Sequence, residues 1–165
     1  MAFDAFLKID GFPGESPDDK HKNEIVCLSH AFGVSNAGTA ASGTGGLGHG
    51  KSTFTDMACT FSSQKCSPKI LAACAAGDHF TKAVLTIRKQ GGTQLDYQII
   101  TMTTCTFSSF NSGGAATGNE HHHGTIDSVT INFAEIDFEY KEQTSSGGAG
   151  PTTKAGYNVA GQKKK

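Results

Sequence analysis

The sequence has 165 residues, the length of one ordinary domain, and its charge is almost balanced. Lysine and arginine together number 14, against 15 aspartate and glutamate residues, so no general field attracts nucleic acid or an anionic membrane. No stretch approaches the roughly 20 apolar residues that a membrane-spanning helix needs. We therefore expect neither a nucleic-acid partner nor membrane insertion.

The start of the chain lacks the basic residues and the continuous apolar run of a signal peptide. If the protein leaves the cell, it is expected to do so without a cleaved signal peptide. The cysteines form an odd set without any C-x-x-C pair, which predicts free, partly buried thiols rather than a zinc site or a disulfide framework. They are Cys27, Cys59, Cys66, Cys74 and Cys105.

Alternation of polar and apolar residues, typical of strands, recurs along most of the ordered sequence. The predicted strands are residues 3–9, 25–34, 53–61, 80–89, 95–107 and 126–141. The glycine-containing segment 90–94 has the spacing of a hairpin connection between two of them. The chain is therefore predicted to be mainly β.

The strand at 126–141 changes phase in its middle. Its apolar residues lie at odd positions first and at even positions afterwards: Val129, Ile131, Phe133, then Ile136, Phe138, Tyr140. One extra residue near Ala134 and Glu135, a β-bulge, would keep both halves facing the same core. A bend is expected at that point.

One short segment is predicted to be a helix. Ser67 is expected as its N-cap, Pro68 at its first position and Gly77 as its stop, with Ile70, Leu71 and Cys74 on one face. So short a helix does not persist alone in water, so it must cover the strands. Many strands and one helix predict a small β-barrel of two packed antiparallel sheets with one short flanking α-helix.

Three stretches are predicted to be loops, at residues 36–50, 111–124 and 144–150. Loops as long as the first two are usually functional or disordered. Because no internal repeat appears, we expect a single barrel domain over residues 1–143. The remaining residues, 144–165, are expected to be a flexible linker and a C-terminal tail.

Two long segments, residues 25–50 and 97–119, contain no charged residue. Soluble monomers usually protect strands and edges with charge, so these neutral surfaces indicate assembly. The alternative is that both segments lie inside the barrel wall. We expect the loop at residues 38–50 to contact other subunits, through Gly38, Ala41, Thr44, Gly45, Gly46 and Gly48.

The loop also contains GGLGHGKS, residues 45–52, which matches the phosphate-loop pattern G-x-x-x-x-G-K-S. That mechanism needs a helix after the loop, so that its dipole and backbone amides meet the phosphate. Residues 53–61 alternate as a strand instead. Lys51 is therefore interpreted as a solubilising charge, and a nucleotide-binding function is the weaker alternative.

No catalytic, cofactor or metal site is predicted. His121, His122 and His123 could coordinate a transition metal, but adjacent side chains point in different directions and no second ligand group is evident. Asp78 and His79 are interpreted as a strand entry. The alternating carboxylates Glu135, Asp137 and Glu139 are interpreted as a solvated strand face.

Several segments, taken in order, resemble the haemolysin-coregulated protein family of type VI secretion systems. They are FDAFLKIDGFPGES, followed by charged residues and His21, then EIVCLSHAFGVSNAG, SPKILAACAAGDHFTKAVLTIRKQGG and VTINFAEIDFEY, with KAGYN at residues 154–158. The similarity runs through most of residues 1–141. The short sequence after Tyr140 leaves no room for the C-terminal toxin domain of some relatives.

The resemblance implies a structural protein rather than an enzyme. Members of this family form hexameric rings that stack into an inner tube, and a loop matching residues 38–50 reaches a neighbouring ring. The implied partners are other copies, a spike protein of the valine-glycine-repeat type, a contractile sheath and effector proteins in the lumen. Assembly in the bacterial cytoplasm precedes secretion. A monomeric carrier of an exported partner is the alternative from the residues alone.

Overall fold

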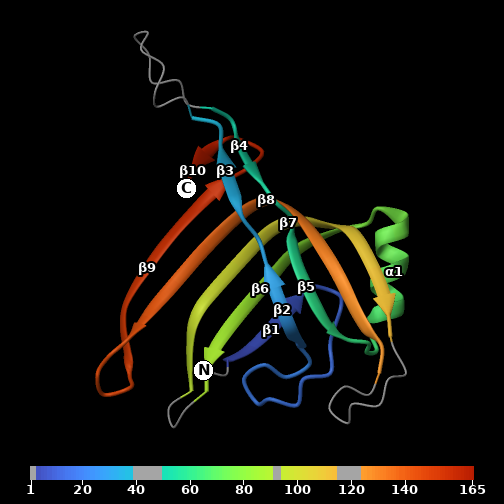
Figure 1. Cartoon of the computed structure of the whole chain (residues 1–165), viewed down its shortest axis with the longest axis horizontal. Helices are drawn as coiled ribbons and strands as arrows, with labels where there is room; N and C mark the ends of the chain where they lie inside the picture. Colours follow the sequence, from blue (N-terminus) through green and yellow to red (C-terminus); the bar gives the residue numbers. More distant parts are fainter. Residues whose placement is uncertain (1–2, 39–49, 91–93, 115–123) are drawn as a thin grey trace.

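The computed structural model describes residues 3–38, 50–90, 94–114 and 124–165, which contain ten strands and one helix (Figure 1). The strands are β1 Phe3–Ile9, β2 Ile25–Ala31, β3 Val34–Asn36, β4 Ser52–Phe54, β5 Met57–Ser62, β6 His79–Lys89, β7 Leu95–Gly113, β8 Ile126–Gln143, β9 Ala149–Asn158 and β10 Lys163–Lys164. The helix is α1 Ser67–Ala76.

The main sheet has the order β10-β9-β8-β5-β2-β1-β6-β7, and a further pairing between β7 and β8 closes it. Among the described residues, the strands β8, β5, β2, β1, β6 and β7 therefore form a closed antiparallel barrel. This confirms the predicted β-barrel with one flanking helix. Closure removes the exposed edges that an open sheet of these strands would have.

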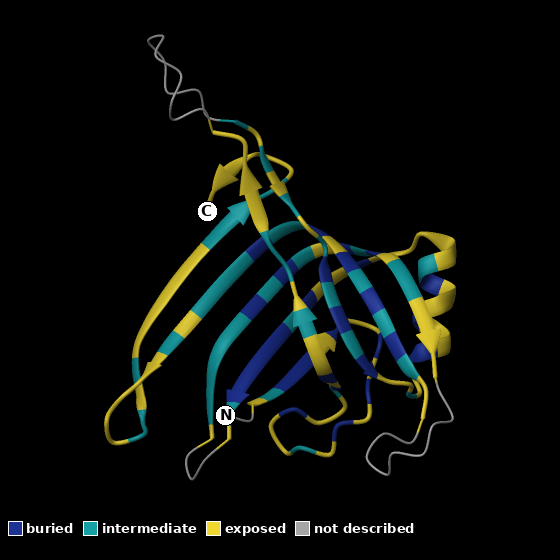
Figure 2. Cartoon of the chain, viewed as in Figure 1, coloured by how far each residue is buried: buried dark blue, intermediate teal, exposed yellow. Residues whose placement is uncertain are grey.

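The barrel encloses one apolar core (Figure 2). Alternate residues of β1 face inward, so Ala5, Leu7 and Ile9 are buried. The largest fully buried side chains also include Phe61, Ile25, Met57, Leu85, Ile100, Met102 and Ile131. Each such aliphatic or aromatic side chain contributes about 1.5–3 kcal/mol by leaving water.

Two predicted strands are each divided into two shorter strands in the structure, and the two break points lie beside each other. Residues 25–34 break between β2 and β3, and residues 53–61 break between β4 and β5. There Gly33 and Thr55 are hydrogen-bonded to each other through Thr55 N to Gly33 O at 2.9 Å and Gly33 N to Thr55 Oγ1 at 2.7 Å. Beyond this point β3 and β4 pair only with each other and leave the barrel as a two-stranded arm.

The phase change predicted in β8 is present, but its cause differs from the predicted bulge. Phe133 and Ile136 are both buried, so both halves of β8 do face the core. The register with β7 is continuous there, because Thr103 pairs with Glu135 and Cys105 with Phe133. In the partner strand β7, the alternation of buried and outward residues also switches, and it does so at Thr104, whose φ is 54°. Both strands bend together over the barrel (Figure 1).

The C-terminal residues differ from the expected linker and tail. Residues 149–158 form β9, which pairs with the second half of β8 from Glu135↔Asn158 to Gln143↔Ala149. Strand β10 then folds back and pairs with Asn158 and Tyr157. Beyond Ile131, β8 has left its partner β5, so its edge is available to the following chain. The glycine-rich stretch before β9 is a turn rather than a long linker.

The helix begins one residue earlier than predicted. Cys66 is the N-cap without a side-chain cap, Ser67 lies inside the first turn, and the Ser67 hydroxyl accepts a hydrogen bond from Gln64 N. Gly77 ends the helix with φ 71°, as predicted. Ile70 faces the core, whereas Leu71 is exposed. The side of α1 that packs on β7 is therefore narrower than the predicted apolar face, which included Leu71.

All five cysteines are free thiols, and Cys74 is the least buried of them. Burial raises the pKa of Cys66 and of Cys105 to about 11. The hydrogen bond with Cys59, together with burial, raises the pKa of Cys27. Thiols in this state are poor nucleophiles at neutral pH. They behave as small apolar side chains of the core.

Candidate assembly surfaces

The β3–β4 arm carries the predicted contact loop at its end. Val34 pairs with Phe54, Ser35 with Thr53, and Asn36 with Ser52. Gly38 follows β3 and is exposed. The other predicted contact residues, Ala41, Thr44, Gly45, Gly46 and Gly48, lie outside the described residues. The arm therefore directs the chain that leads into this loop away from the barrel core (Figure 1).

Lys51 and Ser52 end the phosphate-loop match, and the structure places a strand after them. Lys51 is exposed, and Ser52 begins β4. A phosphate loop needs the N-terminus of a helix at this place. The strand predicted after Ser52 is therefore confirmed, although it is shorter than expected.

Because β4 supplies no helix dipole, we expect no specific nucleotide binding. Calorimetry with ATP and magnesium should show no saturable heat for the natural chain or for Lys51→Ala. A micromolar dissociation constant that Lys51→Ala abolishes would contradict this expectation.

The outward face of the barrel over β5, β8 and the second half of β7 is rich in hydroxyl groups. Ser29 and Thr60 form a cross-strand hydrogen bond between β2 and β5. Thr130 Oγ1 lies 2.7 Å from Ser108 Oγ and 2.6 Å from Ser109 Oγ, which links β8 to β7. Thus the neutral strands are not wholly enclosed within the wall. One face is core and the other is an uncharged surface.

One carboxylate, Asp56, joins this hydroxyl-rich face. Its Oδ1 accepts a hydrogen bond from Asn132 Nδ2 at 2.9 Å, and its Oδ2 accepts one from the Ser108 hydroxyl at 2.5 Å. These bonds hold Asp56, which directly precedes β5, against β7 and β8. A carboxylate that is satisfied by two fixed donors is a structural link between neighbouring strands.

Exposed apolar side chains lie on the neighbouring part of β2. Val26 is 42% exposed and Leu28 is 46% exposed. Leu28 lies at a register shift between Cys27 and Ser29, which turns it outward in the pairing with β5. A second apolar surface is a hollow of about 210 Å³ at the arm base, lined by Phe32, Phe54, Ile136, Phe138, Ala155, Gly156 and Tyr157.

The carboxylates of β8 lie on the outward face, as the sequence predicts. Lys165 pairs with Glu135 and Asp137, each at 2.8 Å, and Lys141 pairs with Glu139 at 3.5 Å. His79 is exposed at the first position of β6, which agrees with the predicted strand entry.

Neither a cluster of metal ligands nor a helix that could span a membrane occurs among the described residues of the chain. Among those residues, no group of three or more histidine, cysteine, aspartate and glutamate side chains could hold a metal ion. The three histidines at positions 121–123 are outside them. No described helix is long and apolar enough to cross a membrane.

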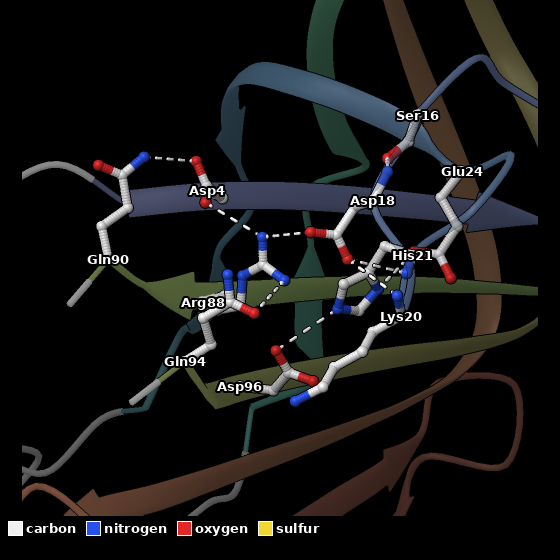
Figure 3. Close-up of polar contacts among 10 residues, drawn as sticks. All are labelled: Asp4, Ser16, Asp18, Lys20, His21, Glu24, Arg88, Gln90, Gln94 and Asp96. Atoms are coloured by element: carbon white, nitrogen blue, oxygen red, sulfur yellow. Dashed lines mark hydrogen bonds and ion pairs between the residues drawn. The ribbon is translucent and has the colours of Figure 1, made fainter. Parts of the chain in front are cut away.

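A buried charged cluster holds the segment between β1 and β2 against the barrel (Figure 3). Arg88 is 4% exposed and lies opposite Asp4 in the β1–β6 register. Its Nη2 donates to Asp18 Oδ2 at 2.7 Å and to Asp4 Oδ2 at 3.3 Å. The guanidinium carbon also lies 4.8 Å from the centroid of the Phe6 ring. This geometry fixes the segment before β2 with charge-assisted hydrogen bonds.

His21 extends the same cluster. Its ring stacks on Phe6 at 4.2 Å between centroids with an interplanar angle of 7°. Nδ1 lies 2.9 Å from Glu24 Oε2, and Nε2 lies 3.4 Å from Asp96 Oδ1 (Figure 3). Arg88 Nε is buried without a hydrogen-bond partner, but the carboxylates and the histidine ring are held by groups of the same cluster. We interpret the cluster as a fastening of residues 10–24 to the barrel.

The described residues thus form a closed barrel with a projecting two-stranded arm and a hydroxyl-rich outer face over β5, β7 and β8. The chain matches the family described as "Type VI secretion system effector, Hcp" over residues 6–140. It is also 38% identical to Protein hcp1 of Pseudomonas aeruginosa over 161 residues, which is 96% of each chain. The chain therefore belongs to the Hcp family of type VI secretion proteins.

Solved structures agree with this assignment. A type six secretion system protein superimposes with a TM-score of 0.92 at 33% identity, covering 99% of this chain and 100% of the other. Hcp1 from Salmonella typhimurium gives 0.82 at 33% identity over the whole of both chains. A type VI secretion system effector from Yersinia pestis gives 0.75 at 26% identity, with 94% and 100% covered. Hcp proteins are structural and secreted.

Sequence reasoning missed the Arg88 cluster and the ordered C-terminal strands. One signal was available for the first: Arg88 is the only arginine in the sequence, and it follows an alternating apolar strand. Its partners Asp4 and Asp18 could not be selected, because 70 or more positions separate them from Arg88. The β1–β6 register places Asp4 opposite Arg88, and the packing of residues 10–24 against the barrel brings Asp18 to it.

Proposed function

We propose that this chain is the subunit of a type VI secretion inner tube, in which hexameric rings stack and carry effector proteins for export. The observation that supports it most is the β3–β4 arm, which projects from a closed barrel whose own strands need no further pairing. Membership of the Hcp family supports the interpretation of this arm as a contact within a type VI secretion assembly. In this role the protein is a conduit and carrier, and it performs no catalysis.

The two apolar surfaces support a ring. Val26 and Leu28 lie on β2, whereas the hollow lined by Phe54 and Phe138 lies at the arm base. Unlike patches on one subunit favour head-to-tail contacts, and such contacts close into a ring when the rotation allows it. The weak contacts of each arm are repeated around the ring, which strengthens stacking. Residues 1–143 with the C-terminal strands would then act as one tube subunit.

The proposed partners are other copies of the chain, a spike protein of the valine-glycine-repeat type, the contractile sheath and effectors in the lumen. The subunit would assemble in the bacterial cytoplasm and leave the cell through its own secretion machine. The neutral hydroxyl-rich face, with Thr60, Thr130 and Ser109, suits a wall that cargo must pass, because it offers hydrogen bonds without strong charge attraction.

Light scattering of the purified chain tests the ring directly. We expect a mass six times that of the chain, and electron microscopy should show rings that stack into tubes at high protein concentration. A monomer mass at every accessible concentration would exclude the ring. Binding of an exported protein by such a monomer would instead favour the alternative, a monomeric carrier.

A further inference from the structure

The β3–β4 arm has little support of its own. Each strand has three residues, and the pair forms a sheet separate from the barrel. An isolated two-stranded ribbon is marginally stable at best in water. Its direction must therefore be set by contacts at its base. Phe54 supplies an apolar one, at 5.5 Å from Tyr157 and 6.1 Å from Phe133 between ring centroids.

The polar contact at the arm base comes from the C-terminal segment. The Ser52 hydroxyl donates to Gln162 Oε1 at 3.2 Å and also lies 3.2 Å from the Tyr157 hydroxyl. Ser52 makes the side-chain hydrogen bonds that join the described arm strands to the rest of the chain. A hollow of about 640 Å³ lies beside them, lined by Asn36, Gly50, Lys51, Tyr157, Gln162 and Lys164. Solid packing on this side of the arm is therefore limited.

Gln162 is itself held in an unusual conformation. Its φ is 51°, and its Nε2 donates to Val159 O at 2.6 Å. The turn before it is closed by Gly161 N, which donates to Asn158 Oδ1 at 2.6 Å. Val159 N donates to Ala134 O at 2.8 Å, which anchors the turn to β8. A non-glycine residue at positive φ persists when its surroundings determine the conformation.

Lys165 holds the far end of this segment on β8. Its Nζ lies 2.8 Å from both Glu135 Oε2 and Asp137 Oδ2, and its backbone N donates to Gly156 O at 3.0 Å. Asp137 and Glu135 together raise the pKa of Lys165. A series of contacts thus runs from β8 through residues 157–165 to Ser52 in the arm. Lys163 and Lys164 are exposed on the short strand between them.

We propose that residues 157–165 position the arm for its contact with the next ring, and that Gln162 and Lys165 are the positioning residues. This inference rests on the proposed tube function and adds to it a reason for the folded C-terminal segment. Neither residue need touch the next ring. Each acts by fixing Ser52, and through Ser52 the direction in which the arm leaves the barrel.

Four single variants test the proposal: Gln162→Ala, Lys165→Ala, Lys165→Arg and Lys163→Ala. The last is a matched control, because it removes the same charge from the same segment without breaking the pairs with Glu135 and Asp137. Hydrogen exchange of the β3 and β4 amides is measured on unstacked rings. Ring mass and tube length are then measured on the same samples.

We expect Gln162→Ala and Lys165→Ala to speed amide exchange in Val34–Asn36 and Ser52–Phe54 about fivefold, the ratio that corresponds to one lost hydrogen bond. Their rings should keep the natural mass but form fewer and shorter tubes. Lys165→Arg, which keeps the positive charge, should retain the natural exchange rates and tube formation. Lys163→Ala should leave both unchanged.

Unchanged exchange in the arm would overturn the proposal, as would normal tubes from arms that exchange faster. Equal effects of Lys163→Ala and Lys165→Ala would also overturn it, since charge alone would then explain them. Loss of the rings would show a role in folding or ring closure instead. If the natural chain forms no rings at all, the proposed function fails, whereas the exchange measurement still decides whether the segment holds the arm.

Discussion

Replacing both Ala41 and Thr44 with aspartate is expected to leave the rings intact and to abolish their stacking and the secretion of the protein. The loop at residues 38–50 is neutral and contains no large apolar residue except Leu47. Its contacts would then be backbone hydrogen bonds and packing of small residues, worth about 0.5–1.5 kcal/mol each. Such contacts cannot offset the cost of burying an unpaired charge, which is several kcal/mol. The like charges also recur around the ring and repel one another.

Ring mass by light scattering, tube formation by electron microscopy and secretion from the cell are measured separately. The paired substitution Ala41→Asn and Thr44→Asn is the matched control, because it has nearly the same size without the charge. We expect that control to retain most of the tube formation. Normal tubes and normal secretion with both aspartates would show that this loop makes no close contact between rings.

Arg88→Met is expected to have the largest effect on stability, a loss of about 3 kcal/mol from the free energy of unfolding. Methionine can fill much of the space beside Phe6, but it leaves the carboxylates of Asp4 and Asp18 without their cation. Removing one partner of a buried ion pair costs more than the pair contributes, because a charge stays unpaired. The figure is at the low end for such variants because both carboxylates are partly exposed.

Chemical denaturation at fixed protein concentration measures this loss, since stability also depends on assembly. A loss of about 3 kcal/mol corresponds to a fall in melting temperature of roughly 6–12 °C for a chain of this length. Arg88→Lys should lose less, because its ammonium keeps the charge but reaches fewer acceptors. A change of under about 0.5 kcal/mol in Arg88→Met would contradict a structural role for the cluster.

The same cluster makes a pH dependence with a defined sign. The hydrogen bond from Arg88 lowers the pKa of Asp18 from 3.8 to about 2. A carboxyl whose pKa is lower in the folded state contributes stability that is fully present above pH 4 and is lost as the pH falls toward 2. Unfolding curves between pH 5 and pH 2 should therefore show a shallower acid decline for Arg88→Met than for the natural chain.

Much of the barrel could be predicted from local sequence, because alternation of side chains along a strand is a local property. Strands β1 and β6 have nearly the expected bounds, and Gly77 ends the helix as expected. The Hcp family could also be identified from the amino-acid sequence, because its characteristic segments follow one another in the same order along this chain. The loop at residues 38–50 was inferred to be a contact from its neutral composition and, for stacking, from the family resemblance. Its contacts with other subunits stay a prediction.

The tertiary structure decided which strand segments leave the barrel and what holds them. Alternation continues through Gly33 and Thr55, so the sequence showed no break where β2 turns into the arm. The C-terminal strand β9 was mistaken for a tail because its glycines, threonines and proline form no strong apolar pattern. It exists because β8 departs from β5 beyond Ile131 and leaves an edge to be paired.

The partners of charged residues that lie far apart in the sequence were also decided by the tertiary structure. The sequence shows that Arg88 is charged and lies in a strand, but the register of β1 against β6 decides that it meets Asp4. Lys165 was only a charge near the chain end until the turn at residues 158–162 brought it over Glu135 and Asp137. The sequence by itself determined the class of fold, because periodicity and burial are local. Only the tertiary structure determined these contacts, because they depend on how distant strands pair.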